Sequence, residues 1–170
     1  MDKTITTGFM IVVSVIASVM LFNVLYPAIN QSNDAMIDMK TRLDGRLKNQ
    51  IEVIHAAGEL DSSGLWQDVN GDSNFDLFVW VKNVGSARIS AVEKIDVFIG
   101  PEGNFSRVPH QSNAGGSLPY WTYSIENDSV WNPSATLAIE VHYPSTQASG
   151  RYFVKVVTPN GIASDSFFSI

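Results

Sequence analysis

The chain has 170 residues, no cysteine and a formal net charge of −6 at pH 7. Without cysteine no disulfide can stabilise a domain, so folding depends on a hydrophobic core, which the 45% of apolar residues can supply. Acidic residues also outnumber basic ones from Asp61 onward, which excludes a general nucleic-acid-binding surface. We therefore expect one soluble domain and no nucleic-acid partner.

Residues 1–29 predict a transmembrane anchor helix. Residues 4–33 carry no charge, and residues 8–26 are almost entirely apolar. Nineteen helical residues extend about 28 Å, close to the thickness of a bilayer core. A cleaved signal peptide is disfavoured because it has a basic segment, a shorter apolar run and a small-residue cleavage site. With Lys3 before the span and Asp34 beyond it, we expect a single-pass cell-membrane protein with an extracytoplasmic (pseudoperiplasmic) C-terminal domain.

Residues 30–58 predict an amphipathic helical extension that ends at Ala57, before Gly58. Its apolar side chains recur with an average spacing of 3.6 residues, the α-helical period. Such a stripe can pack on the protein's own β domain, but a helix that continues from a membrane span outruns one small domain. We therefore expect it to drive homo-oligomer assembly through the N-terminal helices. The assembly stripe consists of Met36, Met39, Leu43, Leu47, Ile51 and Ile54.

Residues 59–170 predict an extracytoplasmic β-sandwich domain. Short runs with alternating apolar residues, such as 77–81, 95–99 and 137–143, are separated by Gly, Pro, Asn and Ser. Six or seven strands at this spacing favour an immunoglobulin-like antiparallel β-sandwich. The expected fold class is thus mainly β, with a transmembrane plus amphipathic helix in front. The aromatic segment 117–123, which lies beside Pro and Gly, is expected to be partly exposed near a loop.

No motif for catalysis occurs in the chain. His55, His110 and His142 lie far apart without an H-E-x-x-H pattern, and there is no nucleophile elbow or phosphate-binding glycine loop. We predict that the protein is not an enzyme, with no catalytic residue, no bound organic cofactor and no small-molecule substrate.

One pattern of oxygen-bearing side chains predicts a possible Ca²⁺ site. Alternating Asp and Asn around Gly71 can supply the hard oxygen ligands that calcium prefers. An EF-hand is excluded because Val79 stands where its glutamate is needed. The alternative is a loop of Asx turns that leads into a strand. The predicted metal ligands are Asp68, Asn70, Asp72, Asn74 and Asp76.

Three N-x-S patterns predict possible glycosylation, at Asn30, Asn104 and Asn127. Sugars at these positions agree with a domain outside the cytoplasm.

Several stretches give the chain a family resemblance: 50–60 (QIEVIHAAGEL), 78–85 (FVWVKNVG), 96–103 (DVFIGPEG) and 152–161 (YFVKVVTPNG). Their order and spacing resemble the FlaF and FlaG accessory proteins of the archaeal flagellum, the archaellum, and FlaG more than FlaF. The resemblance implies a structural component of the motility machinery. It implies a membrane-anchored stator subunit that assembles through its N-terminal helix and links the motor to the cell envelope. It also implies an FlaF-type partner and contact with the S-layer.

Two other functions stay open. A pilin-like or archaellin-like filament subunit also joins a long apolar helix to a β head. It is disfavoured because only three residues precede Thr4, too few for a basic leader peptide. A membrane-tethered adhesin for calcium or glycans depends on residues 68–76 and the aromatic side chains alone.

Overall fold

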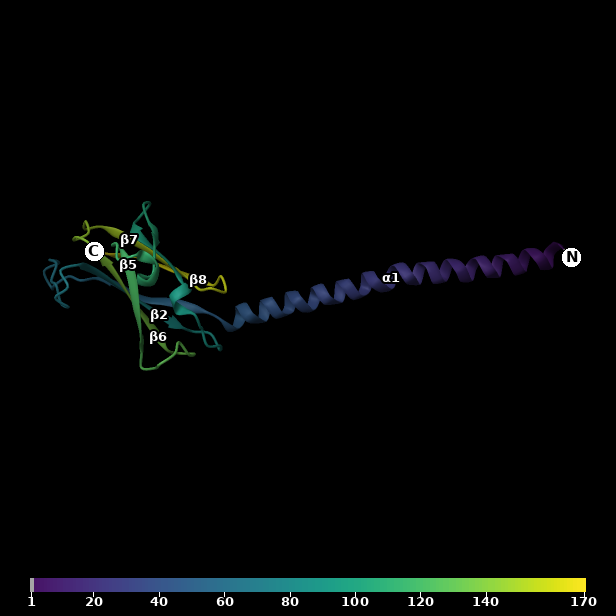
Figure 1. Ribbon diagram of the computed structural model, residues 1–170, viewed down its shortest axis with the longest axis horizontal. Coiled ribbons are helices and arrows are strands. Elements are labelled where there is room, and N and C mark those ends of the chain that lie inside the picture. Colours follow the sequence, from purple (N-terminus) through teal and green to yellow (C-terminus); the bar gives the residue numbers. More distant parts are fainter. Residues whose placement is uncertain (1) are drawn as a thin grey trace. The chain divides into compact units, whose positions relative to one another are not determined.

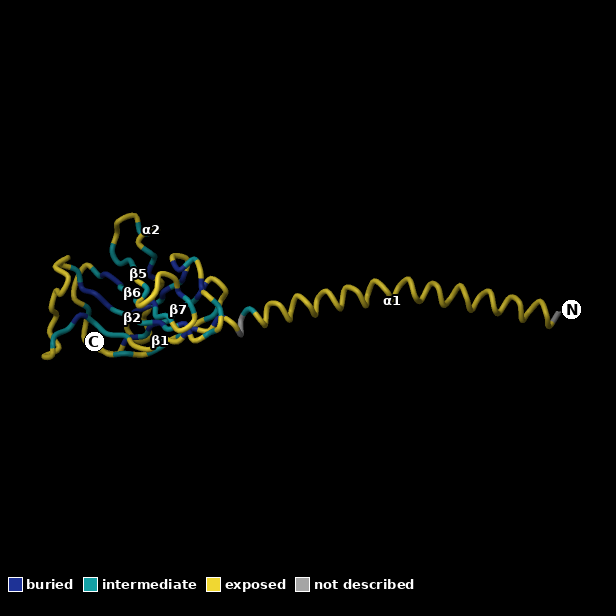
Figure 2. The backbone as a smooth tube through the Cα atoms, turned by 90° about the horizontal axis from the view of Figure 1, so that it is seen from below, coloured by how far each residue is buried: buried dark blue, intermediate teal, exposed yellow. Residues whose placement is uncertain are grey.

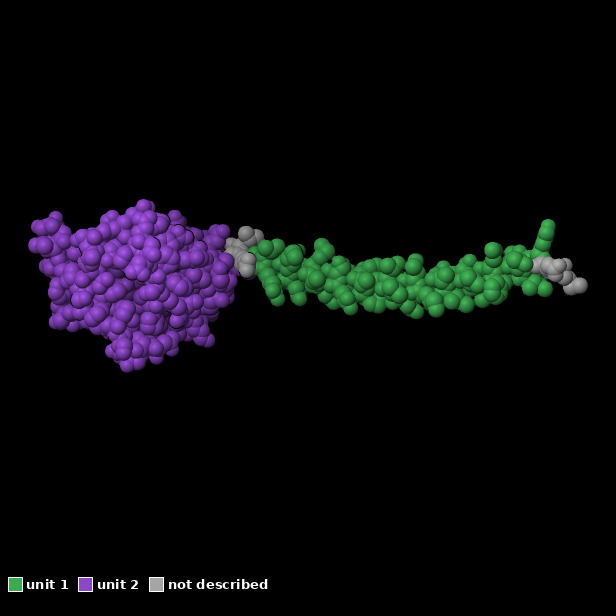
Figure 3. Space-filling model, turned by 90° about the horizontal axis from the view of Figure 1, so that it is seen from above, with its two compact units in different colours: residues 1–44 green, residues 45–170 purple. Residues whose placement is uncertain are grey.

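The computed structural model describes residues 2–170, apart from the side chains of Asp2, Arg46 and Leu47. The chain divides into two compact units, residues 1–44 and residues 45–170 (Figure 3). The first unit is a single helix, α1 (Asp2–Lys48), whose last turn belongs to the second unit. The second unit contains eight β-strands.

Helix α1 passes through Pro27 without ending. Every residue of it from Lys3 to Asp44 is exposed (Figure 2). Its segment Lys3–Gly45 is long and apolar enough to cross a membrane, judged by length and composition. The structure therefore confirms the predicted N-terminal apolar helix.

The second unit is a sandwich of two antiparallel sheets, each of four strands, with the orders β1-β2-β6-β5 and β4-β3-β7-β8 (Figure 1). These are the A-B-E-D and C′-C-F-G orders of immunoglobulin-type sandwiches, so the predicted fold class is confirmed. The strands are β1 (Ile51–Gly58), β2 (Phe75–Asn83), β3 (Asp96–Pro101), β4 (Ser106–Val108), β5 (Tyr120–Glu126), β6 (Thr136–Tyr143), β7 (Arg151–Val157) and β8 (Ala163–Ser169). Two short helices, η1 (Val92–Lys94) and α2 (Gln111–Ala114), lie in the connections.

The core lies between the two sheets and comes from alternate residues of each central strand. Leu77, Val79 and Val81 of β2 are fully buried, as their alternation predicts. β6 and β7 contribute in the same way, and two tryptophans lie fully buried among these side chains. The largest buried side chains are Trp121, Trp131, Tyr152 and Phe75.

The predicted extension of the helix to Ala57 is wrong. Helix α1 ends at Lys48, and strand β1 begins at Ile51 and pairs with β2. Ile51 is therefore part of the sandwich core, whereas Ile54 stands at a β-bulge and is half exposed. The β-branched residues here favour a strand, and the hydrogen bonds available from β2 decide between the two structures. The boundary between helix and sandwich thus falls near residue 49 and not at residue 58.

The end of the helix is held by the turn that follows β2. The carbonyl oxygen of Lys48 accepts hydrogen bonds from the backbone N–H groups of Ser86 (2.8 Å) and Ala87 (3.0 Å). A helix leaves its last carbonyl groups without partners inside the helix, and this turn supplies them. Gly85 makes the approach possible, because a Cβ atom there would overlap the carbonyl oxygen of Lys48 and the nitrogen of Gln50.

Segment 117–123 is partly exposed, as predicted, with the exception of Trp121. Trp121 lies in β5 and is fully buried, because the alternation of this strand turns its ring into the core. Its neighbour Tyr123 keeps 37% of its surface exposed.

Replacement of Gly85 by alanine is expected to destabilise the sandwich. The added methyl group overlaps backbone atoms that cannot rotate away, which costs about 1–3 kcal/mol in the free energy of unfolding. Thermal unfolding of the detergent-solubilised protein, followed by circular dichroism, measures the effect. Gly45→Ala is the matched control, since nothing lies within 4 Å of that Cβ position and alanine favours a helix. Equal melting temperatures for the two variants would contradict the account of this junction.

Candidate functional site

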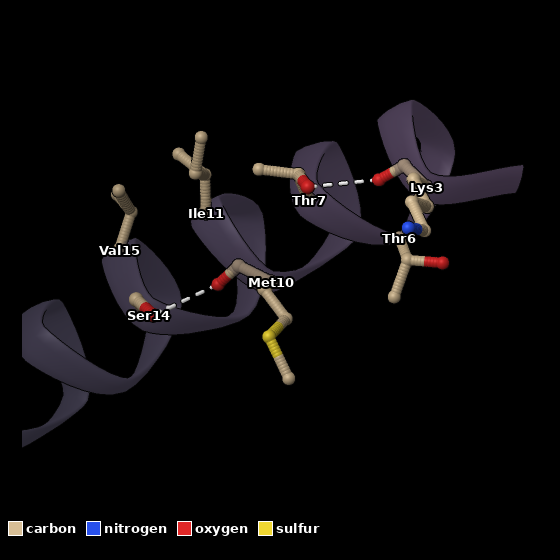
Figure 4. A pocket seen from close by; sticks show the side chains of 7 residues that line it. All are labelled: Lys3, Thr6, Thr7, Met10, Ile11, Ser14 and Val15. Atoms are coloured by element: carbon tan, nitrogen blue, oxygen red, sulfur yellow. Dashed lines mark hydrogen bonds between the residues drawn. The ribbon is translucent and has the colours of Figure 1, made fainter. Parts of the chain in front are cut away.

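Among the described residues, most of the exposed large apolar side chains lie on α1. Figure 4 shows a shallow depression on it, lined by Lys3, Thr6, Thr7, Met10, Ile11, Ser14 and Val15. All seven side chains come from one helix, so the depression is an open helix surface and not an enclosed ligand site. Large apolar residues from Ile5 to Ile29 expose about half to three quarters of their surface.

Three hydroxyl groups of this segment donate hydrogen bonds to the preceding turn of the helix. Thr7 Oγ1 donates to the carbonyl oxygen of Lys3, and Ser14 Oγ to that of Met10, each at 2.8 Å (Figure 4). Ser18 makes the same bond to Ser14. A bilayer offers no water to such groups, so bonds to the preceding turn make these polar residues compatible with a membrane.

The predicted assembly stripe is present only in part. Met36, Met39 and Leu43 lie on one face of α1 and expose 68%, 64% and 52% of their surface. The side chain of Leu47 lies outside the described residues. Since Ile51 and Ile54 belong to β1, the stripe on the helix consists of the first four residues.

The connection from β1 to β2 carries most of the predicted calcium ligands, and its carboxylates bind the loop's own backbone. Asp68 accepts from the N–H groups of Gly71 (2.7 Å) and Ser73 (3.1 Å), and Asp72 accepts from that of Asn74 (2.8 Å). These contacts form the Asx turns of the alternative interpretation. The calcium site itself stays a prediction.

Asp76 lies apart from that loop, at the start of β2. Its carboxylate is fully buried, and Asn70 donates to its Oδ2 through Nδ2 at 2.7 Å. The amide nitrogen of Asn70, and not its oxygen, is therefore directed at Asp76. Of the five predicted ligands, the structure brings Asp72 and Asp76 into one cluster of possible metal-binding atoms within the described residues.

The third member of this cluster is His142, which the sequence pattern did not indicate. Asp76 and His142 are paired across β2 and β6, and Nδ1 of the imidazole lies 2.7 Å from Oδ1 of Asp76. The other ring nitrogen, Nε2, lies 3.2 Å from Thr122 Oγ1 on β5. The only available signal was the alternation in residues 137–143, which turns His142 away from the core while its neighbours point inward.

Burial dominates the electrostatics of this pair. Desolvation, with the nearby negative charges of Asp72 and Glu140, raises the pKa of Asp76 to about 6, against the lowering effect of His142. Hydrogen bonds from Asn74 lower the pKa of Asp72. Two carboxylates a few ångströms apart thus differ in their affinity for protons, because one is buried and the other faces solvent.

Buried Glu59 holds the first part of the same loop against the sandwich. Its carboxylate accepts from Trp66 Nε1 at 3.2 Å and from the backbone N–H of Val69. Two buried carboxylates therefore hold the loop from residue 59 to residue 74. Glu59 binds Trp66 and Val69, and Asp76 binds Asn70.

The three predicted glycosylation sites are all exposed. Asn30 lies on α1, Asn104 follows β3, and Asn127 follows β5. Their modification stays a prediction.

Comparison with known proteins identifies the family. The model of archaeal-type flagellin matches residues 5–166, nearly the whole chain. The chain belongs to the archaeal-type flagellin family. An uncharacterized protein of Archaeoglobus fulgidus is 25% identical over 175 residues, which cover 98% of each chain.

Two solved structures from Sulfolobus acidocaldarius are similar to this member of the family. One is the archaellum periplasmic stator protein FlaG, with 27% identity and a TM-score of 0.54, over 71% of this chain and 99% of that one. The other is the stator protein complex of FlaF and FlaG, with 28% identity and a TM-score of 0.53, over 70% of this chain and 88% of that one. The predicted FlaG-like fold is confirmed, and likeness to structural stator proteins confirms the prediction of a non-enzymatic protein.

The stability of this archaeal-type flagellin family member is expected to depend on pH through Asp76. Its pKa of about 6 in the folded state lies above the ordinary aspartate value of 3.8, so between these values the folded chain holds a proton that the unfolded chain releases. The resulting stabilisation is complete below pH 3.8 and is lost as the pH rises through 6. Relative to Asp76→Asn, the free energy of unfolding should therefore fall by about 3 kcal/mol across this window. Urea titrations at several pH values, with EDTA present, measure the difference, and a difference independent of pH would contradict it.

Proposed function

We propose that this protein is a membrane-anchored stator subunit of the archaellum that assembles through its N-terminal helix and links the motor to the cell envelope. The observation that carries the proposal is the likeness of its sandwich to FlaG, joined here to an apolar helix that could cross a membrane. A stator must resist torque, which requires both an anchor and a rigid outer domain. The helix serves as the anchor and the disulfide-free, well-packed sandwich as the outer domain.

The proposed orientation places the sandwich outside the cytoplasm. Basic residues favour the cytoplasmic side of a membrane span. Lys3 lies before the apolar segment, whereas the first charged residues after it are Asp34 and Asp38, which are both acidic. The solved FlaG is named as a periplasmic protein, which agrees with this orientation. Exposed sequons on and beyond α1 are available for sugars on the same side.

An FlaF-type protein is the proposed partner, because a solved complex of FlaF and FlaG resembles this chain. Through that partner, or directly, the sandwich contacts the S-layer. Further copies of this chain cover the apolar stripe of Met36, Met39, Leu43 and Leu47, since water is an unfavourable neighbour for three large exposed side chains on one face.

A filament subunit is the second candidate, favoured by the family itself, whose description is archaeal-type flagellin. In that case the apolar helix packs against other helices along the axis of a filament. The two candidates place the same surface in different surroundings, lipid in one case and protein in the other.

Fractionation of cells separates the two candidates. A stator subunit is expected to stay in the membrane when filaments are sheared off, and to co-purify from detergent extract with an FlaF-type protein, motor components or S-layer protein. Recovery in the sheared filaments, in amounts comparable with the major filament protein, would instead establish the filament subunit. Co-purification of none of these partners from the membrane fraction would overturn the stator proposal.

A charged residue in the stripe is expected to abolish oligomers without unfolding the sandwich. Leu43→Glu places a charge where apolar contact between helices is proposed, whereas Ile37→Glu is the matched control. Ile37 is 62% exposed on the same helix but lies about 100° around the axis from Met36. Crosslinking and light scattering in detergent measure the oligomers, and circular dichroism tests the fold. Oligomers that resist Leu43→Glu would show that the stripe does not hold the copies together.

A further inference from the structure

The outer face of the β1-β2-β6-β5 sheet carries a cluster of metal-ligating groups that neither the anchor nor the stripe involves. Asp76 and His142 face each other on adjacent strands, and Asp72 reaches them from the β1–β2 loop. One ligand atom from each residue lies within 4.8 Å of the other two. The cluster lies at the start of β2, the end of that strand farthest from the junction with α1, since Asn83 at the other end pairs with Ile51.

We propose that Asp72, Asp76 and His142 bind a divalent transition-metal ion, best matched by Zn²⁺, which fastens the β1–β2 loop to the sheet. Imidazole nitrogen with two carboxylate oxygens is a ligand set that zinc accepts. Calcium prefers six to eight oxygen ligands, so the imidazole argues against that ion at this position.

The two distances from the imidazole to the carboxylates are close to those of a zinc site. Nδ1 of His142 lies 3.6 Å from Oδ2 of Asp72 and 2.7 Å from Oδ1 of Asp76. Ligand atoms in a tetrahedral zinc site, with bonds of 2.0–2.2 Å, lie about 3.3 Å apart. Asp76 thus needs to move away from the imidazole by about half an ångström, while Asp72 needs to move closer by less. Three protein ligands leave the fourth position to water or to a neighbouring side chain.

The ligands are held by a second layer of hydrogen bonds. When Nε2–H of His142 donates to Thr122 Oγ1, the lone pair of Nδ1 is directed at the two carboxylates. Asn70 donates to Asp76 Oδ2, which leaves Oδ1 on the side of the imidazole. Asn74 holds Asp72 through Nδ2 at 2.9 Å. Such contacts orient metal ligands in known sites and raise affinity for the ion.

The charges around the cluster are also unbalanced. Glu140 adds a third carboxylate, with Oε1 at 3.4 Å from Asn70 Nδ2. In the described part of the chain, the only ion pairs of Asp72 and Asp76 are with His142. Three carboxylates thus share one imidazole in a partly buried space, and a divalent cation would offset two negative charges there.

Isothermal titration of the untagged full-length protein in detergent, stripped with EDTA, tests the site with ZnCl₂ and CaCl₂ as probes. We expect one Zn²⁺ per chain, a rise of several degrees in the melting temperature, and binding at least 100-fold weaker for His142→Gln. Asp72→Asn should weaken zinc binding at least tenfold. Because Asp72 lies in an exposed loop, this substitution should leave the fold intact. Thr122→Val, which removes a positioning residue, should weaken it by about 10- to 100-fold.

Two control variants distinguish this site from others. His55→Gln removes an exposed surface histidine, and Asp68→Asn changes a predicted calcium ligand outside the cluster; both should leave zinc affinity unchanged. No zinc binding, or binding that Asp72→Asn and His142→Gln leave intact, would overturn the proposal. Calcium binding that depends on Asp68, with no zinc binding, would replace it by the oxygen-only site. None of these outcomes bears on the stator proposal, whose test is co-purification.

Discussion

The close backbone approach between Gly85 and the end of α1 is the constraint on which the rest of the sandwich depends. It satisfies the carbonyl oxygen of Lys48 and ends the helix, so that β1 starts at Ile51 in register with Asn83. That register places Ile51 in the core and leaves β1 as the edge strand of its sheet. β1 is also tied to the other sheet, because the N–H of Val53 donates to Ser164 Oγ of β8 at 3.0 Å. A side chain at position 85 would overlap the backbone of Lys48 and Gln50 and so disturb the end of α1 and the start of β1.

The exposed apolar surface of α1 imposes a second constraint. Fully burying one large apolar side chain stabilises a protein by about 1.5–3 kcal/mol, and α1 leaves many such residues in contact with solvent. The sandwich has a closed core of its own between its two sheets. In the proposed stator, lipid surrounds the uncharged first half of this surface, and other copies of the helix cover the stripe at Met36, Met39 and Leu43.

The fold was largely predictable because its signals are local. Alternation in β2, β3, β6 and β7 depends on one face being buried, and the same alternation is visible in the sequence. The predictions failed where contacts between residues far apart in the sequence determine the structure. The three-residue spacing of Ile51 and Ile54 is also compatible with a strand that contains a bulge, and only the turn after β2 shows which structure forms. Likewise Asp76 and His142 are 66 residues apart, so their contact follows from strand pairing that no local pattern reveals.

The length and charge of α1 bear on the choice between stator and filament. A helix of 47 residues extends about 70 Å, more than twice the thickness of a bilayer core. Its charged residues between Asp34 and Asp44 all lie in the second half and are all exposed. Burial of these charges among tightly packed helices carries a large desolvation cost, whereas a helix that leaves the membrane keeps them in water. The one apolar face of that second half then needs only a few partner helices, as in a small oligomer, which favours the stator.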